Sequence, residues 1–299
     1  MAGKLDLDLD LDLDLDLDLD LRAAGRSGRG PRYNTEDFCR LAPVGEPATL
    51  TWPLASPYPA NWDASRRVWP YLREFILDGG WTTANDPVQS IFTALNAQTT
   101  IFVPSTANNV AKRLTSAELG HQVRLVLDAS IDRADRAGEI LDQASGAGAL
   151  RYWTGMLRLD PRKEPNTHLL MLVAHRIGEF VAMGLKDKYL MRRPAQLYPR
   201  ILPLIDGPDT PSYPSSHALQ AHLISLVLQA AVTANRETFK SLADLANRVA
   251  YNREVAGVHF RMDSEAGAFA AAQCAAKLTA STGGAALIAS ARTELQNLP

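Results

Sequence analysis

Cysteine and long apolar runs are both scarce in this chain. Only 2 of the 299 residues are cysteines, and Cys39 and Cys274 are too few and too far apart for a disulfide framework or a cysteine metal site. No uninterrupted apolar run reaches the roughly 18 residues that a membrane-spanning helix needs. The most apolar stretches, Leu169–Leu185 and Ala218–Ala234, contain His, Arg, Glu or Gln. They predict buried helices of a bundle, with no membrane span.

A large charge of one sign is also missing. The formal net charge is −2 at pH 7. The first 31 residues hold eight Asp against four Lys and Arg, which gives −4 and leaves +2 for the remainder. Neither value is typical of nucleic-acid binding or of attachment to a membrane surface. We therefore expect a small-molecule ligand and no nucleic-acid partner, and we have no expectation for the oligomeric state.

The N-terminal segment has an unusual composition. Residues Leu5 to Leu21 alternate Leu and Asp without exception, and a Gly/Arg-rich stretch follows. Strict alternation has the period of a strand, but the like charges on one face repel and no partner strand follows. We expect residues 1–32 to be a disordered tail and residues 33–299 to form a single domain. The segment lacks the basic and apolar regions of a signal peptide, so a cytoplasmic protein is expected.

The Ala- and Leu-rich remainder predicts an all-α fold, a helical bundle of about eight to ten helices with one anion site between helix ends. Asp86 and Pro87 indicate a capped helix start. The predicted helices cover Ser65–Leu77, a helix from Pro87, Ser116–Ala144 with an interruption near Asp128–Ser130 and an end at Gly146–Gly148, then Asn166–Arg192, Ser215–Ala234, Glu237–Asn252, Asp263–Thr279 and Ala285–Asn297.

Three short motifs in the C-terminal half carry the chemistry. The first is Lys186-x6-Arg193-Pro194. Seven residues are nearly two helical turns, so both cations are expected on one helix face, roughly 10 Å apart along its axis. The planar guanidinium of Arg193 suits phosphate oxygens. Pro194 disfavours helical geometry at Arg193, which should end the helix there.

The second motif is Pro214-Ser215-Ser216-His217, which precedes an apolar helical run. Ser215 is a plausible N-cap, and a helix N-terminus offers unpaired N–H groups and positive potential to an anion. His217 would then lie in the first turn of the helix, beside the bound group.

The third motif is Arg253-x5-His259-x3-Asp263. Arg253 supplies a second guanidinium, and His259 a nucleophile or ligand. Asp263, four residues later, can reach the ring of His259 and fix its tautomer. Two histidines with a carboxylate behind one of them suit nucleophilic attack combined with proton donation.

The order and spacing of these motifs resemble the signature of the type 2 phosphatidic acid phosphatase/vanadium haloperoxidase superfamily. The resemblance covers about residues 170–275, with the signature at 186–263. It implies that His259 attacks phosphorus, that Asp263 orients it, and that His217 protonates the leaving alcohol and then activates water. It also implies that the oxyanion is bound by Lys186, Arg193, Ser215, the Ser216 amide and Arg253.

Details of the motifs point to both branches of this superfamily. Residues 186–194 look like the segment of soluble bacterial acid phosphatases, whereas Arg261 is more typical of haloperoxidases. Thr210 stands where haloperoxidases often carry Phe or His, which does not support a halide site. Ser216 replaces the Gly of the family pattern Pro-Ser-Gly-His. We expect a negative φ at Ser216, because residues at the start of a helix normally have one.

These observations predict a metal-independent phosphoric ester hydrolase that acts through phosphohistidine and requires no cofactor. The first alternative is a vanadium-dependent haloperoxidase, in which vanadate is the cofactor and His259 its ligand. The second is a catalytically weak, phosphate-binding helical interaction protein, for which Ser216 is the hint. The sequence does not identify the physiological substrate.

Overall fold

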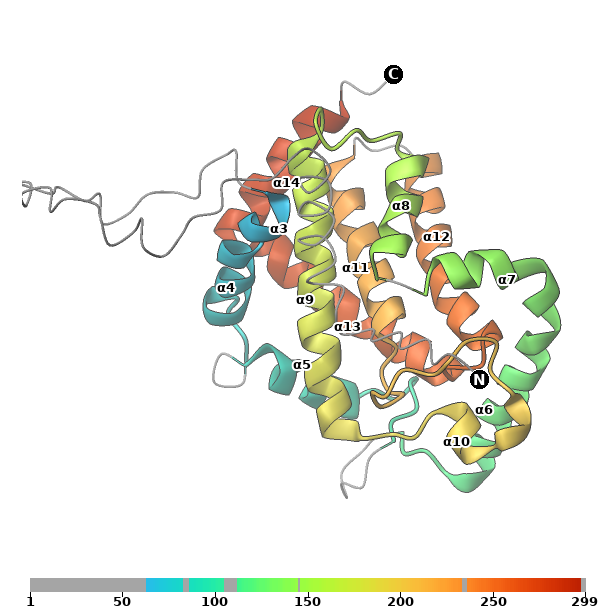
Figure 1. The fold of residues 1–299 in the computed structure, drawn as a ribbon. Helices are drawn as coiled ribbons and strands as arrows, with labels where there is room; N and C mark the ends of the chain where they lie inside the picture. Colours follow the sequence, from blue (N-terminus) through green and yellow to red (C-terminus); the bar gives the residue numbers. More distant parts are fainter. Residues whose placement is uncertain (1–62, 83–85, 105–111, 145, 233–235, 297–299) are drawn as a thin grey trace, which may run out of the picture. The chain divides into compact units, whose positions relative to one another are not determined.

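The described part of the chain is built from helices (Figure 1). The computed structural model of the protein describes residues 63–82, 86–104, 112–144, 146–232 and 236–296. The helices, labelled as in Figure 1, are α3 (Ala64–Arg67), α4 (Trp69–Asp78), α5 (Pro87–Asn96), α6 (Ser116–Ala129), α7 (Arg133–Asp142), α8 (Gly146–Met156), α9 (Pro165–Tyr189), α10 (Pro194–Leu197), α11 (Ser216–Ala231), α12 (Arg236–Val255), α13 (Arg261–Ala280) and α14 (Thr282–Leu295).

The all-α prediction is confirmed. Among the described residues, the only β-type pairing is an isolated bridge between Val103 and Arg113. Ten of the described helices have ten residues or more, which agrees with the expected eight to ten. The predicted start of α5 is also confirmed, because Pro87 is its first residue and the Asp86 side chain accepts from the Gln89 N–H.

Helix α11 is the centre of the bundle and packs against α9, α12 and α13. Most of its apolar side chains are buried, so the helix contributes to the core on several sides. Gly267 of α13 permits a close approach to the start of α11: a Cβ there would lie 2.8 Å from the Ser215 carbonyl oxygen and 2.9 Å from the Ala218 Cβ. This packing places the first turns of α11 and α13 side by side, and the Ser215 N–H donates to the Asp263 carbonyl oxygen at 3.0 Å.

The prediction that one helix carries both Lys186 and Arg193 is wrong. Helix α9 ends at Tyr189, because Leu190 adopts a left-handed conformation with φ 49° and ψ 34°. The chain then runs extended, and the Met191 carbonyl oxygen accepts from the Ser212 N–H at 2.8 Å. Arg193 is the residue before α10, with φ −74° and ψ 160°. The effect expected of Pro194 on its neighbour is therefore present, but the helix ends before Arg193.

Helix α8 was not predicted, since Gly146–Gly148 was interpreted as a helix end. Tertiary packing outweighs the weak helix propensity of glycine here. Trp153 of α8 is completely buried, and its Nε1–H donates to the Ser225 hydroxyl of α11 at 2.9 Å. The interruption predicted at Asp128–Ser130 is present slightly later, as a 3-10 turn over Ser130–Asp132 between α6 and α7. The predicted helix Ser65–Leu77 is divided into α3 and α4 at Val68.

The remaining expectations concern the tail and the membrane. The compact unit that contains the described helices begins at Asp63. The predicted tail (1–32) and the predicted domain start at residue 33 lie outside the described residues. Among the described helices, the segment Pro165–Leu197 is long and apolar enough to cross a membrane by length and composition, and 56% of its most apolar window is buried inside the protein. Burial of this kind is also a property of core helices, as predicted for Leu169–Leu185.

Candidate anion-binding active site

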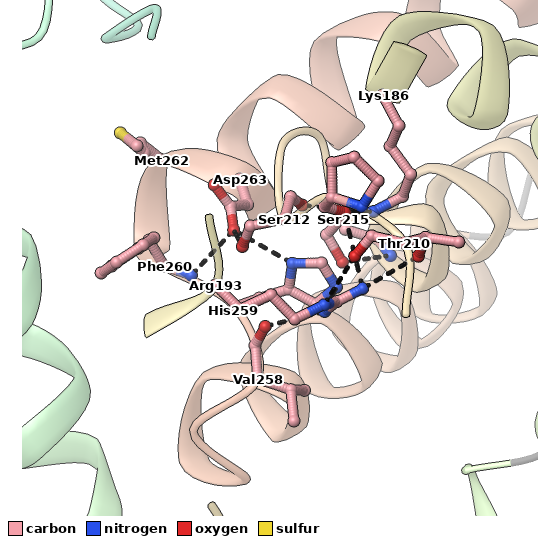
Figure 2. A network of polar contacts seen from close by, with 12 residues as sticks. Lys186, Arg193, Thr210, Ser212, Ser215, Val258, His259, Phe260, Met262 and Asp263 are labelled. Carbon is pink, nitrogen blue, oxygen red and sulfur yellow. Dashed lines mark hydrogen bonds and ion pairs between the residues drawn. The ribbon is translucent and has the colours of Figure 1, made fainter. Parts of the chain in front are cut away.

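The three sequence motifs meet where several helices begin or end (Figure 2). Lys186 lies in the last turn of α9, and Arg193 directly precedes α10. His217 lies in the first turn of α11, Arg253 in the last turn of α12, and Asp263 in the first turn of α13. The predicted site therefore lies between helix ends. Each functional side chain is placed by a different element of the core.

Asp263 and His259 form a buried pair. The His259 Nδ1 lies 3.0 Å from the Asp263 Oδ2, as predicted from their spacing. The same Oδ2 accepts from the Phe260 N–H at 3.0 Å, and the first turn of α13 favours a negative charge. Burial raises the pKa of Asp263 to about 6, although the Ser212 hydroxyl and the Phe260 N–H act in the opposite direction.

The second ring nitrogen of His259 faces a cation. Figure 2 shows the ring between Asp263 and Arg193, with 3.2 Å from its Nε2 to the Arg193 Nη1. A guanidinium only donates hydrogen bonds, so the Nε2 must be the acceptor and the ring proton must be on Nδ1. Burial and the neighbouring Arg193 hold the pKa of His259 well below its ordinary value, which keeps the ring neutral. His259 thus presents an unprotonated Nε2.

Arg193 is held by backbone oxygens on several sides. Its Nη1 donates to the Val258 carbonyl oxygen at 2.9 Å, and its Nε to the Thr210 carbonyl oxygen at 2.9 Å. Its Nη2 donates to the Thr210 hydroxyl at 3.1 Å. Burial lowers the pKa of Arg193 to about 10, so the guanidinium remains charged at neutral pH. The contacts fix its position beside His259.

Lys186 is 1% exposed and donates from Nζ to the carbonyl oxygens of Pro211 and Ser212. Burial, and to a smaller degree Arg193, lower the pKa of Lys186 to about 7, while the Asp263 carboxylate raises it. The loop that carries the second motif therefore packs on both cations of the first. Although Lys186 and Arg193 are not on one helix, the fold brings them together around this loop.

Arg253 has unused hydrogen-bonding capacity in the interior. It is 1% exposed, and its Nη2 donates to the Ile140 carbonyl oxygen at 2.9 Å, at the C-terminal end of α7. Within the described ranges its Nε and Nη1 have no hydrogen-bond partner. Burial lowers the pKa of Arg253 to about 10, which leaves it charged at neutral pH. Buried donors without partners are costly, so these two nitrogens favour an acceptor from a ligand.

The start of α11 agrees with prediction at two residues. Ser215 is the N-cap, and its hydroxyl accepts from the Ala218 N–H at 3.3 Å. Ser216 is the first helical residue and does not have positive φ, so its replacement of Gly introduces no backbone strain. The hint for a phosphate-binding protein without turnover therefore has no support from backbone strain at Ser216.

His217 makes its ring contact with the protein backbone. Its Nε2 lies 3.0 Å from the Gln143 carbonyl oxygen, which can only accept, so the Nε2 carries a proton. Burial, followed by Arg253 and His259, holds the pKa of His217 well below its ordinary value. The ring is neutral and lies within electrostatic range of the other site residues. Its Nε2–H donates a hydrogen bond to the Gln143 carbonyl oxygen in this structure.

Three residues near the site were not identified from the sequence as members of it. Ser212 donates from its hydroxyl to the Asp263 Oδ2 at 2.5 Å. Gln143 holds His217, and its side-chain Oε1 accepts from the Asn252 Nδ2 at 2.9 Å. Thr210 was considered for a halide site, but it contacts Arg193 through its carbonyl oxygen and hydroxyl. The position of Ser212 two residues before the second motif is the signal that could have identified it, whereas nothing in the sequence pointed to Gln143.

Arg261 has a structural contact that its motif did not predict. Its Nε donates to the Glu254 Oε2 at 2.6 Å, and its guanidinium lies 5.9 Å from the Tyr251 ring centroid. Glu254 is almost fully buried, so this ion pair joins α12 to the start of α13. Arg261 was the residue that favoured a haloperoxidase by resemblance. Its observed partners explain it as part of the framework around the motif.

Comparison with known proteins found likenesses among solved structures. No protein-family model and no curated protein matches the chain. A solved structure described as the crystal structure of the first bacterial vanadium-dependent iodoperoxidase is similar with a TM-score of 0.41 and 16% sequence identity. The match covers 68% of this chain and 54% of that one, so the chain corresponds to about half of that protein. At this TM-score and identity, the case for any function rests on the site itself.

The pKa shifts at the site predict a pH-dependent response to anions. The raised pKa of Asp263 contributes stability that is lost as pH rises towards 6, and the lowered pKa of Lys186 contributes stability that is lost as pH falls through 7. When no anion is supplied, these two groups therefore stabilise the fold least at about pH 6–7, where both are charged. Phosphate should raise the melting temperature more at pH 6.5 than at pH 9, where Lys186 is neutral.

Thermal unfolding with phosphate, against chloride at equal ionic strength, measures this difference. A ligand at 100 times its Kd stabilises by about 2.7 kcal/mol. The variant Lys186→Met should give a smaller phosphate-induced shift that is equal at the two pH values. An equal phosphate-induced shift at both pH values in the unmodified protein would contradict the role given to Lys186.

Proposed function

We propose that the protein is a phosphoric ester hydrolase that works through a phosphohistidine intermediate. The observation that carries the proposal is the state of His259. Its Nδ1–H is held by Asp263 at 3.0 Å, and its unprotonated Nε2 faces the buried cations. A neutral imidazole with one nitrogen fixed by a carboxylate and the other free of a proton is an activated nucleophile.

The first step transfers the phosphoryl group to His259. The Nε2 first gives up the hydrogen bond that it accepts from the Arg193 Nη1. Its lone pair then attacks phosphorus, a P–N bond forms and the P–O bond to the alcohol breaks. The ring becomes positively charged, and Asp263 stabilises this charge through Nδ1–H without accepting the proton. The phosphate ester binds as its monoanion and gives its proton to the neutral His217. The resulting imidazolium donates its Nε2 proton to the leaving oxygen, which returns His217 to the neutral state. For this transfer the leaving oxygen replaces the Gln143 carbonyl oxygen as the acceptor of that proton.

The second step releases phosphate. A water molecule gives a proton to the neutral His217 and attacks phosphorus, and the P–N bond to the His259 Nε2 breaks. His217 is then an imidazolium and gives one proton to the departing phosphate, so that both histidines are neutral again. The low pKa of His217 makes its imidazolium a strong acid, which favours proton transfer to the leaving group and to the departing phosphate.

Cations supply the stabilisation that phosphoryl transfer requires. Lys186, Arg193 and Arg253 are each buried, so their interaction with the three equatorial oxygens is weakly screened. The two Arg253 nitrogens without partners within the described residues are donors for these oxygens. The Ser215 hydroxyl and the Ser216 N–H at the start of α11 complete the proposed set. The proposed reaction uses these groups in place of a metal ion.

A second candidate is a vanadium-dependent haloperoxidase, because the same residues fit vanadate. The unprotonated Nε2 of His259 is a suitable ligand atom, and the two free donors of Arg253 suit a vanadate oxygen. When bound, vanadate would activate hydrogen peroxide for halide oxidation. The resemblance of Arg261 to haloperoxidases favoured this second candidate, but Arg261 forms an ion pair with Glu254 in the framework. The Thr210 hydroxyl accepts from Arg193. We therefore rank hydrolysis first.

The variant His259→Ala should lose hydrolysis of p-nitrophenyl phosphate by several orders of magnitude, because the reaction then lacks its nucleophile. Neutral or alkaline quenching of the unmodified protein during turnover should trap phosphohistidine, which mass spectrometry of peptides would locate at residue 259. His222→Ala is a control on α11, since His222 has no role in the proposed reaction. Near-normal hydrolysis by His259→Ala would refute the assignment.

Leaving groups should distinguish His217 from His259. If His217 supplies the proton, His217→Ala should lose about 10²–10⁴-fold in kcat/KM with alkyl phosphates and far less with p-nitrophenyl phosphate, whose alcohol needs little protonation. A series of phosphate esters with graded leaving-group pKa measures this as a steeper slope of log kcat/KM in the variant. Equal losses along the series would argue against proton donation by His217.

A further inference from the structure

We propose that Ser212 is a positioning residue of this site, whose hydroxyl fixes the Asp263 carboxylate in the orientation that holds His259. Ser212 is completely buried, and its hydroxyl donates to the Asp263 Oδ2 at 2.5 Å. That oxygen is the one that binds the His259 Nδ1–H at 3.0 Å. The proposal deepens the hydrolase assignment and rests on it for its kinetic consequences.

The Asp263 carboxylate is held through one oxygen. Its Oδ2 takes hydrogen bonds from the Ser212 hydroxyl, the Phe260 N–H and the His259 Nδ1–H. Within the described part of the chain its Oδ1 has no partner, although it is buried. No hydrogen bond from the described residues fixes Oδ1, so the hydrogen bonds that orient the carboxylate are those to Oδ2. At 2.5 Å, the hydrogen bond from the Ser212 hydroxyl is the shortest of these three.

Removal of the Ser212 hydroxyl would leave the Asp263 carboxylate under the attraction of the nearby cations. Lys186 and Arg193 both interact electrostatically with Asp263. With the Ser212 bond gone, Oδ2 keeps only the Phe260 N–H and the His259 Nδ1–H as donors, so the carboxylate is held less firmly in the orientation that binds His259. The Ser212 hydroxyl also opposes the rise in the pKa of Asp263 that burial causes. Both effects weaken the carboxylate as the group that fixes the tautomer of His259 and stabilises its charged form.

The backbone of Ser212 has separate contacts in the same site. Its N–H donates to the Met191 carbonyl oxygen at 2.8 Å, and its carbonyl oxygen accepts from the Lys186 Nζ at 3.3 Å. Ser212 therefore joins the chain beyond α9 to the start of α13. Because these contacts involve the backbone, a change of side chain leaves them in place. Substitution of Ser212 isolates the hydroxyl from the rest of the cluster.

The direct test is proton NMR of the full-length protein in water at low temperature. A buried imidazole N–H bonded to a carboxylate gives a resonance downfield of the amide region, and its absence from His259→Asn assigns it to His259. We expect Ser212→Ala to shift this resonance or broaden it beyond detection, and Ser212→Thr, which keeps a hydroxyl, to restore it. Ser225→Ala is the matched control, because the Ser225 hydroxyl is buried and bonds to the Leu242 carbonyl oxygen, outside the site.

Kinetics gives a second readout on the same variants. For Ser212→Ala we expect kcat to fall by about 10–100-fold, with the inhibition constant of inorganic phosphate within about twofold of the unmodified value, since the cations are unchanged. Ser212→Thr should recover most of kcat. Ser225→Ala should lower the melting temperature while kcat stays unchanged.

Failure of this proposal is separable from failure of the hydrolase assignment. An unchanged downfield resonance in Ser212→Ala would overturn the role of Ser212, whatever the reaction. So would equal loss of kcat and phosphate affinity in Ser212→Ala with no recovery in Ser212→Thr, because that pattern indicates a general structural defect. A protein without phosphatase activity in which Ser212→Ala still alters the resonance would leave Ser212 as a positioning residue and refute only the hydrolase.

Discussion

Positive charge buried without enough negative charge is the constraint on which this structure depends. Lys186, Arg193 and Arg253 are at most 5% exposed. Asp263 interacts electrostatically with Lys186 and Arg193, and Glu139, which also forms an ion pair with Arg248, interacts with Arg253. Burial of a charge that has no partner of opposite sign is unfavourable. Removal of one member of a buried ion pair usually destabilises the folded protein. An anion would correct the imbalance and would bind where the two free donors of Arg253 lie. The cluster is therefore better explained by a ligand than by stability of the fold.

The helices around the cluster are arranged so that their ends meet this charge. The C-terminal end of α7 offers the Ile140 carbonyl oxygen to Arg253, which agrees with the preference of cations for that end of a helix. The first turns of α11 and α13 point their N-termini at the site, where a ligand anion and Asp263 are favoured. Close packing of α11 on α13 at Gly267 fixes the relative positions of these two turns. The same packing of helices therefore forms the core and sets the electrostatics of the site.

Local chemistry could be predicted from the sequence, and long-range contacts could not. The Asp263–His259 contact follows from a spacing of four residues, and the Ser215 cap from residue type, so both were expected and both are present. The end of α9 depends on the extended pairing of Met191 with Ser212, which no local pattern reveals. Helix α8 depends on the burial of Trp153 against α11. Gln143 and Ser212 join the site through contacts 74 and 51 residues away in the sequence.

The effect of orthovanadate on the purified protein tests the central claim most directly. Vanadate resembles the five-coordinate transition state of phosphoryl transfer, and transition-state analogues bind far more tightly than substrates. If the cationic cluster and His259 act in a hydrolase, micromolar vanadate should inhibit hydrolysis of p-nitrophenyl phosphate competitively. Only slight bromide oxidation should follow when peroxide is added. Robust vanadate-dependent bromination, together with negligible hydrolysis by the vanadate-free protein, would contradict the account.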